Sequence, residues 1–311
     1  MTDTTRRRQT AADFAPQVLR LFDKYVHGAI DRRGFLDAAA KFAVGGVTAA
    51  GLLEALSPKF AEAEQVARTD PRVKAETVGF PSPRGYGTGR GYLVRPASAP
   101  PAGGAATPRR DLPIVLVVHE NRGLNPHIED IARRLATANF IAFAPDALHP
   151  LGGYPGDEDQ ARDLFAKLDQ AKTREDFYAA ANYLKGVPGG NGKMGVVGFC
   201  WGGGMTNRLA TRLPDLGAAV SFYGEAPPLD QVPNIKAPLL LMFADNDDRI
   251  NGSWPPYEAA LKQAGVSFQA FRYPGTQHGF NNDTTPRYDA AAAQQAWQRT
   301  IVFFDRQLRG A

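Results

Sequence analysis

The residues best suited to chemistry lie in Gly198-Phe199-Cys200-Trp201-Gly202, where a cysteine stands between two glycines. A short apolar run over residues 193–197 precedes this segment, and a stretch that can form a helix follows over 202–213. A strand, a tight turn and a helix together lift a nucleophile above a sheet. The glycines avoid steric clashes in such a strained turn, and the start of a helix favours a thiolate. Cys200 is therefore a candidate nucleophile, with a small buried apolar side chain as the alternative.

A nucleophilic cysteine needs a base and an acid, which are expected in the chain order nucleophile, acid, histidine. His278 is the most C-terminal of five histidines and lies in a glycine-punctuated loop after the strand-like run 266–273. A continuous apolar run over 238–243, typical of a buried parallel strand, ends in an acidic stretch. From this stretch Asp247 is the preferred partner of His278, while Asp245 and Asp248 remain open as alternatives.

A further carboxylate follows another predicted strand, residues 113–118, in the segment His119-Glu120-Asn121. Ligands of open α/β sheets bind beyond the carboxyl ends of the strands, so Glu120 is expected to lie near Cys200. The backbone amides of Asn121 and Trp201 are the predicted donors to a tetrahedral oxyanion.

Three more side chains are predicted to line the substrate site, namely Tyr223, Phe280 and Asn282, and Trp201 is expected beside them. For the aromatic residues, ordinary core packing is the competing interpretation.

These motifs together resemble the dienelactone hydrolase family, over roughly residues 75–308. The similarity is carried by residues 118–123, by Gly198–Gly203, by the turn at Asp247, and by His278-Gly279-Phe280. The resemblance implies an α/β-hydrolase fold and a Cys–His–Asp triad that opens lactones or esters through an acyl-enzyme. It assigns Cys200 as the nucleophile, His278 as the base and Asp247 as its partner. It also implies that Glu120 interacts with the resting cysteine.

The chain departs from the family pattern where the substrate carboxylate would be bound. An arginine is expected a few residues after the triad histidine, and this chain has Phe280-Asn281-Asn282-Asp283 there. An asparagine cannot replace a bidentate guanidinium. Arg287 is the arginine further along that could approach the site. The predicted substrate is therefore a carboxylic ester or lactone, not dienelactone specifically.

The elements around these motifs alternate between strand and helix after residue 110, which predicts a mostly parallel sheet covered on both faces. Two lead-in strands are expected at 74–80 and 90–95, followed by a low-complexity loop over 97–108. The later strands are expected near 113–119, 140–144, 193–198, 217–222, 238–243 and 267–273, and the helices near 127–138, 157–169, 174–185, 201–213, 254–264 and 286–308. Residues 71–311 are assigned to the hydrolase domain and residues 1–70 to a leader or helical extension.

The composition of the chain excludes several classes of binding partner. The net charge of +4 over 311 residues is too small and dispersed to indicate nucleic-acid binding. A single cysteine excludes an internal disulfide. No cluster has the spacing of a metal site, and the chemistry requires no cofactor, so a small-molecule ester or lactone is the expected partner.

The first 70 residues do not fit the hydrolase pattern. Arg32-Arg33 is followed by an apolar run over 42–53 and by Ala61-Glu62-Ala63, which resembles a twin-arginine export signal. The run is too short to span a bilayer, so no stable membrane anchor is expected. This pattern predicts a periplasmic or secreted protein, with a cytoplasmic location as the alternative. Apolar residues at helical spacing over 14–26 support a second interpretation, a retained helical extension that packs on the domain or on another subunit.

The function predicted from the sequence is therefore a cysteine-dependent hydrolase of carboxylic esters or lactones. A catalytically silent binding protein of the same fold is one alternative, because a fold does not guarantee activity. Thioesterase or peptidase activity on the same scaffold is the other.

Overall fold

The computed structural model describes residues 8–97 and 112–310. Most of the low-complexity loop predicted over 97–108 lies outside the described residues.

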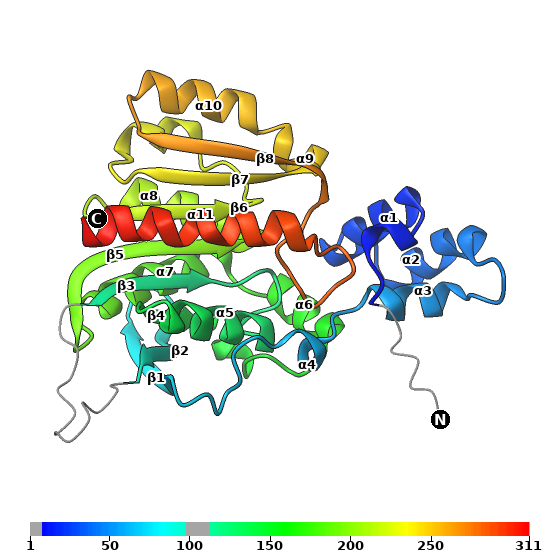
Figure 1. Cartoon of the computed structure of the whole chain (residues 1–311), viewed down its shortest axis with the longest axis horizontal. Coiled ribbons are helices and arrows are strands. Elements are labelled where there is room, and N and C mark those ends of the chain that lie inside the picture. Colours follow the sequence, from blue (N-terminus) through cyan, green and yellow to red (C-terminus); the bar gives the residue numbers. More distant parts are fainter. Residues whose placement is uncertain (1–7, 98–111, 311) are drawn as a thin grey trace.

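One eight-stranded sheet forms the centre of the molecule, in the order β1-β2-β4-β3-β5-β6-β7-β8 (Figure 1). The first two strands pair antiparallel with each other, and β2 pairs antiparallel with β4. All pairings from β4 to β8 are parallel. This is the predicted α/β-hydrolase fold with its two lead-in strands. The strands are β1 (Val73–Ser82), β2 (Gly87–Pro96), β3 (Leu112–Val118), β4 (Ile141–Pro145), β5 (Gly190–Phe199), β6 (Ala218–Phe222), β7 (Leu239–Asn246) and β8 (Phe268–Gln277).

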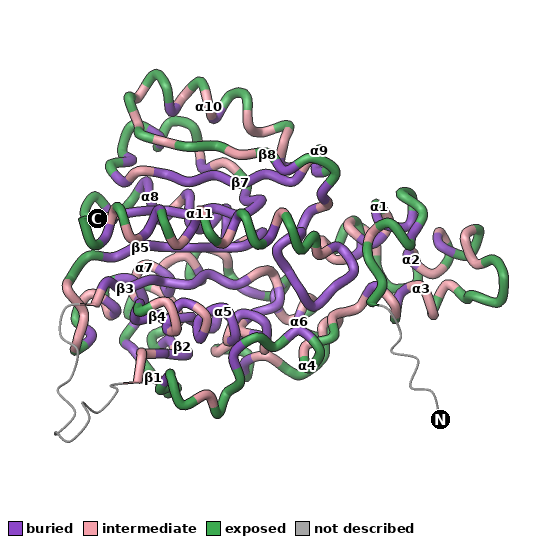
Figure 2. Tube along the Cα trace, viewed as in Figure 1, coloured by how far each residue is buried: buried purple, intermediate pink, exposed green. Residues whose placement is uncertain are grey.

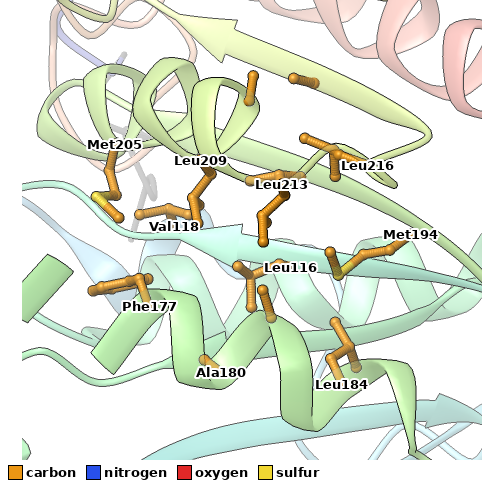
Figure 3. Close-up of a cluster of buried hydrophobic side chains, with 14 of the residues drawn as sticks. Leu116, Val118, Phe177, Ala180, Leu184, Met194, Met205, Leu209, Leu213 and Leu216 are labelled. Atoms are coloured by element: carbon orange, nitrogen blue, oxygen red, sulfur yellow. The ribbon is translucent and has the colours of Figure 1, made fainter. Parts of the chain in front are cut away.

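Helices cover both faces of this sheet because its central strands are apolar on both sides. In β3, Leu116 and Val118 belong to a core shared with α7 and α8, whereas Val115 and Val117 belong to the core under α5 and α11. Figure 3 shows the first of these cores, with side chains of α7 and α8 meeting Leu116 and Val118. The helices of the domain are α5 (Pro126–Thr137), α6 (Glu158–Ala166), α7 (Gln170–Lys185), α8 (Trp201–Arg212), α9 (Asp248–Asn251), α10 (Trp254–Gln263) and α11 (Ala290–Arg309).

Residues 8–63, called the N-terminal segment below, fold as a small helical unit beyond the carboxyl ends of the parallel strands (Figure 1). Its helices are α1 (Pro16–Val26), α2 (Arg32–Ala39), α3 (Ala49–Leu56) and α4 (Phe60–Ala63). The predicted amphipathic helix is therefore present as α1. Its apolar face packs into a separate core whose buried members are Phe14, Val18, Leu19, Phe22, Tyr25, Phe35, Ala39, Leu53 and Leu56. In Figure 2 the helices of this unit alternate between short buried stretches and longer intermediate or exposed ones.

The segment that resembles an export signal is folded in the structure. Arg32 and Arg33 form the first turn of α2, where the Asp31 side chain accepts a hydrogen bond from the Gly34 amide at 2.7 Å. The apolar run over 42–53 is interrupted, because α2 and the short turn after it end at Phe42 and α3 begins only at Ala49. Among the described residues no helix is long and apolar enough to cross a membrane.

Polar contacts fix the N-terminal segment on the hydrolase domain. Arg32 Nη1 lies 3.2 Å from Asp159 Oδ2, and the Tyr25 hydroxyl donates to the same carboxylate. The Asn121 side chain donates to the carbonyl of Val26 at 2.9 Å, at the end of α1. These contacts hold the end of α1 over the region where β3, β5 and β8 end.

Candidate active site

Cys200 lies at the turn between β5 and α8, as predicted, in a backbone conformation with φ +55° and ψ −117°. Residues other than glycine rarely adopt positive φ, and such strain gathers at functional sites. The flanking glycines are sterically required. A Cβ at Gly198 would lie 2.0 Å from the Gly202 carbonyl oxygen, and a Cβ at Gly202 would lie 2.3 Å from the Val118 carbonyl oxygen. The strand and the helix therefore approach each other as closely as backbone allows, and the turn between them projects Cys200 outward.

His278 follows β8 and contacts Asp247, the preferred acid. Its Nδ1 lies 2.5 Å from Asp247 Oδ2, and only 4% of His278 and of Asp247 is exposed. The alternative acids have other contacts: Asp245 forms an ion pair with Arg272 at 2.8 Å, and Asp248 is exposed at the start of α9. Of the three carboxylates, Asp247 is the one that the structure brings to the imidazole.

The other nitrogen of His278 faces the thiol. Cys200 Sγ and ring nitrogens of His278 and His27 all lie within 4.8 Å of one another. His278 Nε2 is buried and has no hydrogen-bond partner within the described residues. It is therefore free to exchange a proton with the sulfur or with a bound ligand.

His27 is the residue that sequence reasoning missed. Its Nε2 lies 3.4 Å from Cys200 Sγ, and its ring meets that of His278 edge-on with 4.7 Å between the centroids. It stands at the C-terminal end of α1, just before Gly28. The apolar spacing predicts α1, but no local pattern indicates that the end of this helix docks beside a thiol 173 residues away.

His27 is held by charged and polar neighbours. Its Nδ1 lies 2.8 Å from the Asp23 carbonyl oxygen and 3.3 Å from Asp23 Oδ1. Arg249 Nη2 lies 3.0 Å from His27 Nε2. Asp23 in turn faces Arg287, whose Nη1 lies 3.6 Å away and whose guanidinium covers the ring of Phe22.

The strand-end residues of β3 are arranged differently from the expectation. Glu120 accepts a hydrogen bond from Asn282 Nδ2 at 2.8 Å, whereas the contact at the thiol is made by His27. The Asn121 side chain binds the end of α1. Trp201 is the first residue of α8, so its amide is one of the N–H groups that a helix leaves without an internal partner. It therefore remains the predicted donor to an oxyanion.

The predicted aromatic residues have unequal positions. Trp201 stacks on His119 with 5.6 Å between centroids and also lines a cavity at the thiol. Tyr223 and Phe280 are fully buried, and the ring of Tyr223 lies 4.9 Å from that of His278. Neither of these two residues lines a cavity at the thiol. They pack behind His278 instead: Tyr223 contacts its ring, and Phe280 contacts Tyr223.

Two cavities share Cys200 and His27 in their walls. The first, called the Glu120 cavity, is lined also by Phe22, Glu120, His278, Asn282 and Arg287, among others. The second, called the arginine cavity, is lined also by Arg162, Arg174, Trp201, Arg208, Glu225 and Arg249, among others. The expected approach of Asn282 and Arg287 to the site is therefore realised at the Glu120 cavity.

The surrounding charges favour a thiolate. Burial opposes ionisation of Cys200, but the charges of His278 and then His27 outweigh it and lower the pKa of the thiol to about 5. Burial also acts against a charge on His278, yet the Cys200 thiolate and Asp247 raise the pKa of this imidazole to about 10. At neutral pH these charges favour a thiolate with an imidazolium partner.

The same three side chains offer the sulfur and nitrogen atoms that Zn²⁺ prefers. His27 completes this group, and both imidazoles already have the acid–base contacts described above.

Comparison with known proteins agrees with this geometry. The model of the dienelactone hydrolase family matches residues 102–308. The chain belongs to the dienelactone hydrolase family. A second family model, YqhI-like, matches residues 6–43, which cover α1 and α2 of the N-terminal segment.

Individual proteins similar to this chain carry names of the same family or of hydrolases. A putative carboxymethylenebutenolidase of Escherichia coli K12 is 33% identical over 208 residues, which cover 62% of this chain and 76% of that protein. A putative hydrolase fragment, YghX, of the same organism is 50% identical over 123 residues, which cover 40% of this chain and 97% of the fragment. The crystal structure of a putative dienelactone hydrolase from Klebsiella pneumoniae superposes with a TM-score of 0.64 at 28% identity, covering 75% of this chain and 99% of that one.

The first prediction concerns the ionisation of Cys200. We expect its alkylation by iodoacetamide to follow a titration with a midpoint near pH 5, because the thiol is deprotonated above its lowered pKa. An unperturbed cysteine titrates near pH 8.5. Rates measured from pH 4 to 9 by mass spectrometry, with glutathione as the reference thiol, check this. A midpoint close to that of glutathione would contradict it.

Proposed function

We propose that this protein hydrolyses carboxylic esters or lactones, with Cys200 as nucleophile, His278 as base and Asp247 as its partner. The observation that carries the proposal is the buried 2.5 Å contact between Asp247 and His278, together with the approach of the other ring nitrogen to a thiol on a strained turn. Asp247 fixes the ring orientation and stabilises the imidazolium, which is the task of the acid in such a triad.

The reaction proceeds in two halves. The Cys200 thiolate attacks the carbonyl carbon, the new C–S bond forms, and the carbonyl electron pair moves to oxygen. The backbone amides of Asn121 and Trp201 are the proposed donors to this oxyanion. The C–O bond then breaks and the leaving oxygen takes a proton from the imidazolium groups beside the sulfur, which leaves His278 neutral. A thioester remains on the enzyme.

Water completes the cycle. Neutral His278 removes a proton from a water molecule, which attacks the thioester carbonyl. Collapse of the second tetrahedral intermediate breaks the C–S bond and regenerates the thiolate. Side chains, backbone amides and water supply every proton and electron pair in these steps.

The arginine cavity supports a substrate with an anionic group. Four arginines line it beside a single glutamate. Within the described residues Arg162 forms an ion pair with Asp159, whereas Arg174 and Arg208 form none and are available to a ligand. The Escherichia coli relative is named a putative carboxymethylenebutenolidase, and that name refers to a butenolide lactone with a carboxyl group. Guanidinium groups suit carboxylate because they can donate two parallel hydrogen bonds.

The test of the proposed function uses purified full-length protein with aryl acetates and simple lactones. We expect turnover by the wild type and a loss of at least about 1,000-fold in Cys200→Ala, since the covalent route requires the sulfur. Asp37→Asn, an exposed change on α2, serves as the matched control. Equal turnover by Cys200→Ala would remove Cys200 from the mechanism, and no turnover by the wild type would favour the silent binding protein.

The anionic preference has its own test. For an ester that carries a free carboxylate on the acyl side, Arg208→Gln should raise KM by about tenfold, because a hydrogen bond to a charged group is lost. KM for the matching neutral methyl ester should change little. Arg306→Gln, on the exposed side of α11, is the control for the loss of one positive charge. Equal effects of Arg208→Gln on both esters would contradict carboxylate binding in the arginine cavity.

Export by a twin-arginine route, to the periplasm or outside the cell, is a second proposal and rests on Arg32-Arg33, the apolar run and the small-residue site ending at Ala63. Cleavage there would remove His27, so export with cleavage and a catalytic role of His27 in the mature protein exclude each other. The N-terminal sequence of the protein from its native host decides the matter: a start near residue 64 is the expected result of export with cleavage, and a start at Met1 or Thr2 would overturn it.

A further inference from the structure

Two acid–imidazole pairs converge on one sulfur atom in this site. Asp247 binds Nδ1 of His278 at 2.5 Å, and Asp23 faces Nδ1 of His27 at 3.3 Å. In each pair the other ring nitrogen faces Cys200, with a direct contact of 3.4 Å for His27. A Cys–His–Asp triad needs only one such pair, so the second requires its own explanation.

The location of His27 favours its protonated form. It caps the C-terminal end of α1, where the helix dipole stabilises a positive charge. Burial lowers the pKa of His27, but the Cys200 thiolate and the hydrogen bond with Asp23 raise it, and the net shift is upward. The helix end and these two neighbours therefore favour an imidazolium beside the thiolate.

His27 Nε2 has a suitable partner in either protonation state. When it is protonated, its N–H can point to Cys200 Sγ at 3.4 Å. When it is neutral, Nε2 can accept a hydrogen bond from Arg249 Nη2 at 3.0 Å. In both states Nδ1–H can donate to the Asp23 carbonyl oxygen at 2.8 Å. This arrangement suits a group that gives up a proton at Nε2 and later regains it.

The ring of His27 also lies between the two cavities that could hold the two parts of a substrate. Cys200 and His27 belong to the walls of both the Glu120 cavity and the arginine cavity. A substrate attacked by Cys200 can therefore have its acyl part in one cavity and its alcohol part in the other, with His27 beside the bond between them.

We propose that His27 is a second catalytic histidine, which carries a proton beside the thiolate and delivers it to the leaving alcohol oxygen. The proposal rests on the proposed function and divides the proton transfers between two imidazoles. It makes the N-terminal segment part of the active site.

The protons balance as follows. As the C–O bond of the first tetrahedral intermediate breaks, its electron pair goes to the alcohol oxygen, which takes the Nε2 proton of His27. Because the thioester no longer carries the thiolate charge that favours a protonated His278, His278 passes its proton to His27, whose ring it contacts. Neutral His278 then takes a proton from the attacking water, and the C–S bond breaks to restore the thiolate. The carboxylic acid product releases its proton to solvent. The net reaction is ester plus water to carboxylate, alcohol and one proton.

Several charged groups surround His27 and set its proton affinity. Asp23 on α1 and the Cys200 thiolate favour the imidazolium, whereas His278 and Arg249 oppose it. Arg287 compensates the charge of Asp23 from the loop before α11.

The experiment compares His27→Gln with the wild type on acetate esters of increasingly basic alcohols. 4-Nitrophenolate leaves without a proton, whereas 4-methoxyphenol and ethanol need one. We expect kcat/KM of His27→Gln to fall less than about tenfold for 4-nitrophenyl acetate and by about 100-fold for 4-methoxyphenyl and ethyl acetate, the scale of general acid catalysis. A merely structural role would lower all three rates by the same factor.

A second readout does not depend on hydrolysis. Iodoacetamide titration of Cys200 in His27→Gln should give a midpoint at least about one pH unit above that of the wild type, because one positive neighbour of the thiolate is lost. Asp23→Asn, which leaves the backbone acceptor of Nδ1 in place, should shift the midpoint in the same direction by less. Asp37→Asn is again the control, and thermal unfolding of each variant monitors folding.

The outcomes separate the two proposals. Equal losses on all esters, or an unchanged alkylation midpoint in both His27→Gln and Asp23→Asn, would overturn the role of His27. If the wild type hydrolyses none of the esters, the proposed function fails, while the alkylation series still reports whether His27 stabilises the thiolate. Should His27→Gln unfold, the Asp23→Asn series decides in its place.

Discussion

The close approach of β5 and α8 at Gly198 and Gly202 is the constraint on which the site depends. Backbone atoms of β3, β5 and α8 meet where any side chain would collide, and the turn between them has to adopt positive φ at Cys200. Strain of this kind costs of order 1–3 kcal/mol and persists only where the surroundings over-determine it. Here the surroundings are two continuous cores on the two faces of the sheet (Figure 2). The sheet thus holds the thiol in one position, although the backbone of Cys200 does not favour positive φ.

Charge then determines the state of that thiol. A buried sulfur in apolar surroundings stays protonated, and burial alone would raise its pKa. Two imidazoles reverse this, and each is oriented by an aspartate. The carboxyl ends of β7 and β8 supply Asp247 and His278, and the end of α1 supplies the other pair. The site is therefore built from the edge of the sheet on one side and from a helix end on the other.

Most of the fold and half of the site could be predicted from sequence. The apolar runs locate the parallel strands, because strands buried on both faces leave a continuous signal, and the chain order of Cys200, Asp247 and His278 follows from the topology. The choice of Asp247 over Asp245 and Asp248 needed coordinates, since a difference of one residue in a turn decides which carboxylate faces inward. Glu120 shows the limit of family resemblance, because its partner here is Asn282. His27 could not have been found locally: its importance arises from the docking of a separate helical unit, which is a property of two surfaces and leaves no periodic pattern.

The separate core of the N-terminal segment has a consequence for temperature. A unit whose apolar core is separate from the cores of the sheet can detach at a lower free energy than global unfolding requires. The hydrolase sheet would then remain intact, with its elbow and its Asp247–His278 pair, while the second imidazole is withdrawn. Heating would lower the reactivity of the thiol before any strand melts, so the temperature at which the protein stops working and the temperature at which it unfolds would be two different properties of one chain.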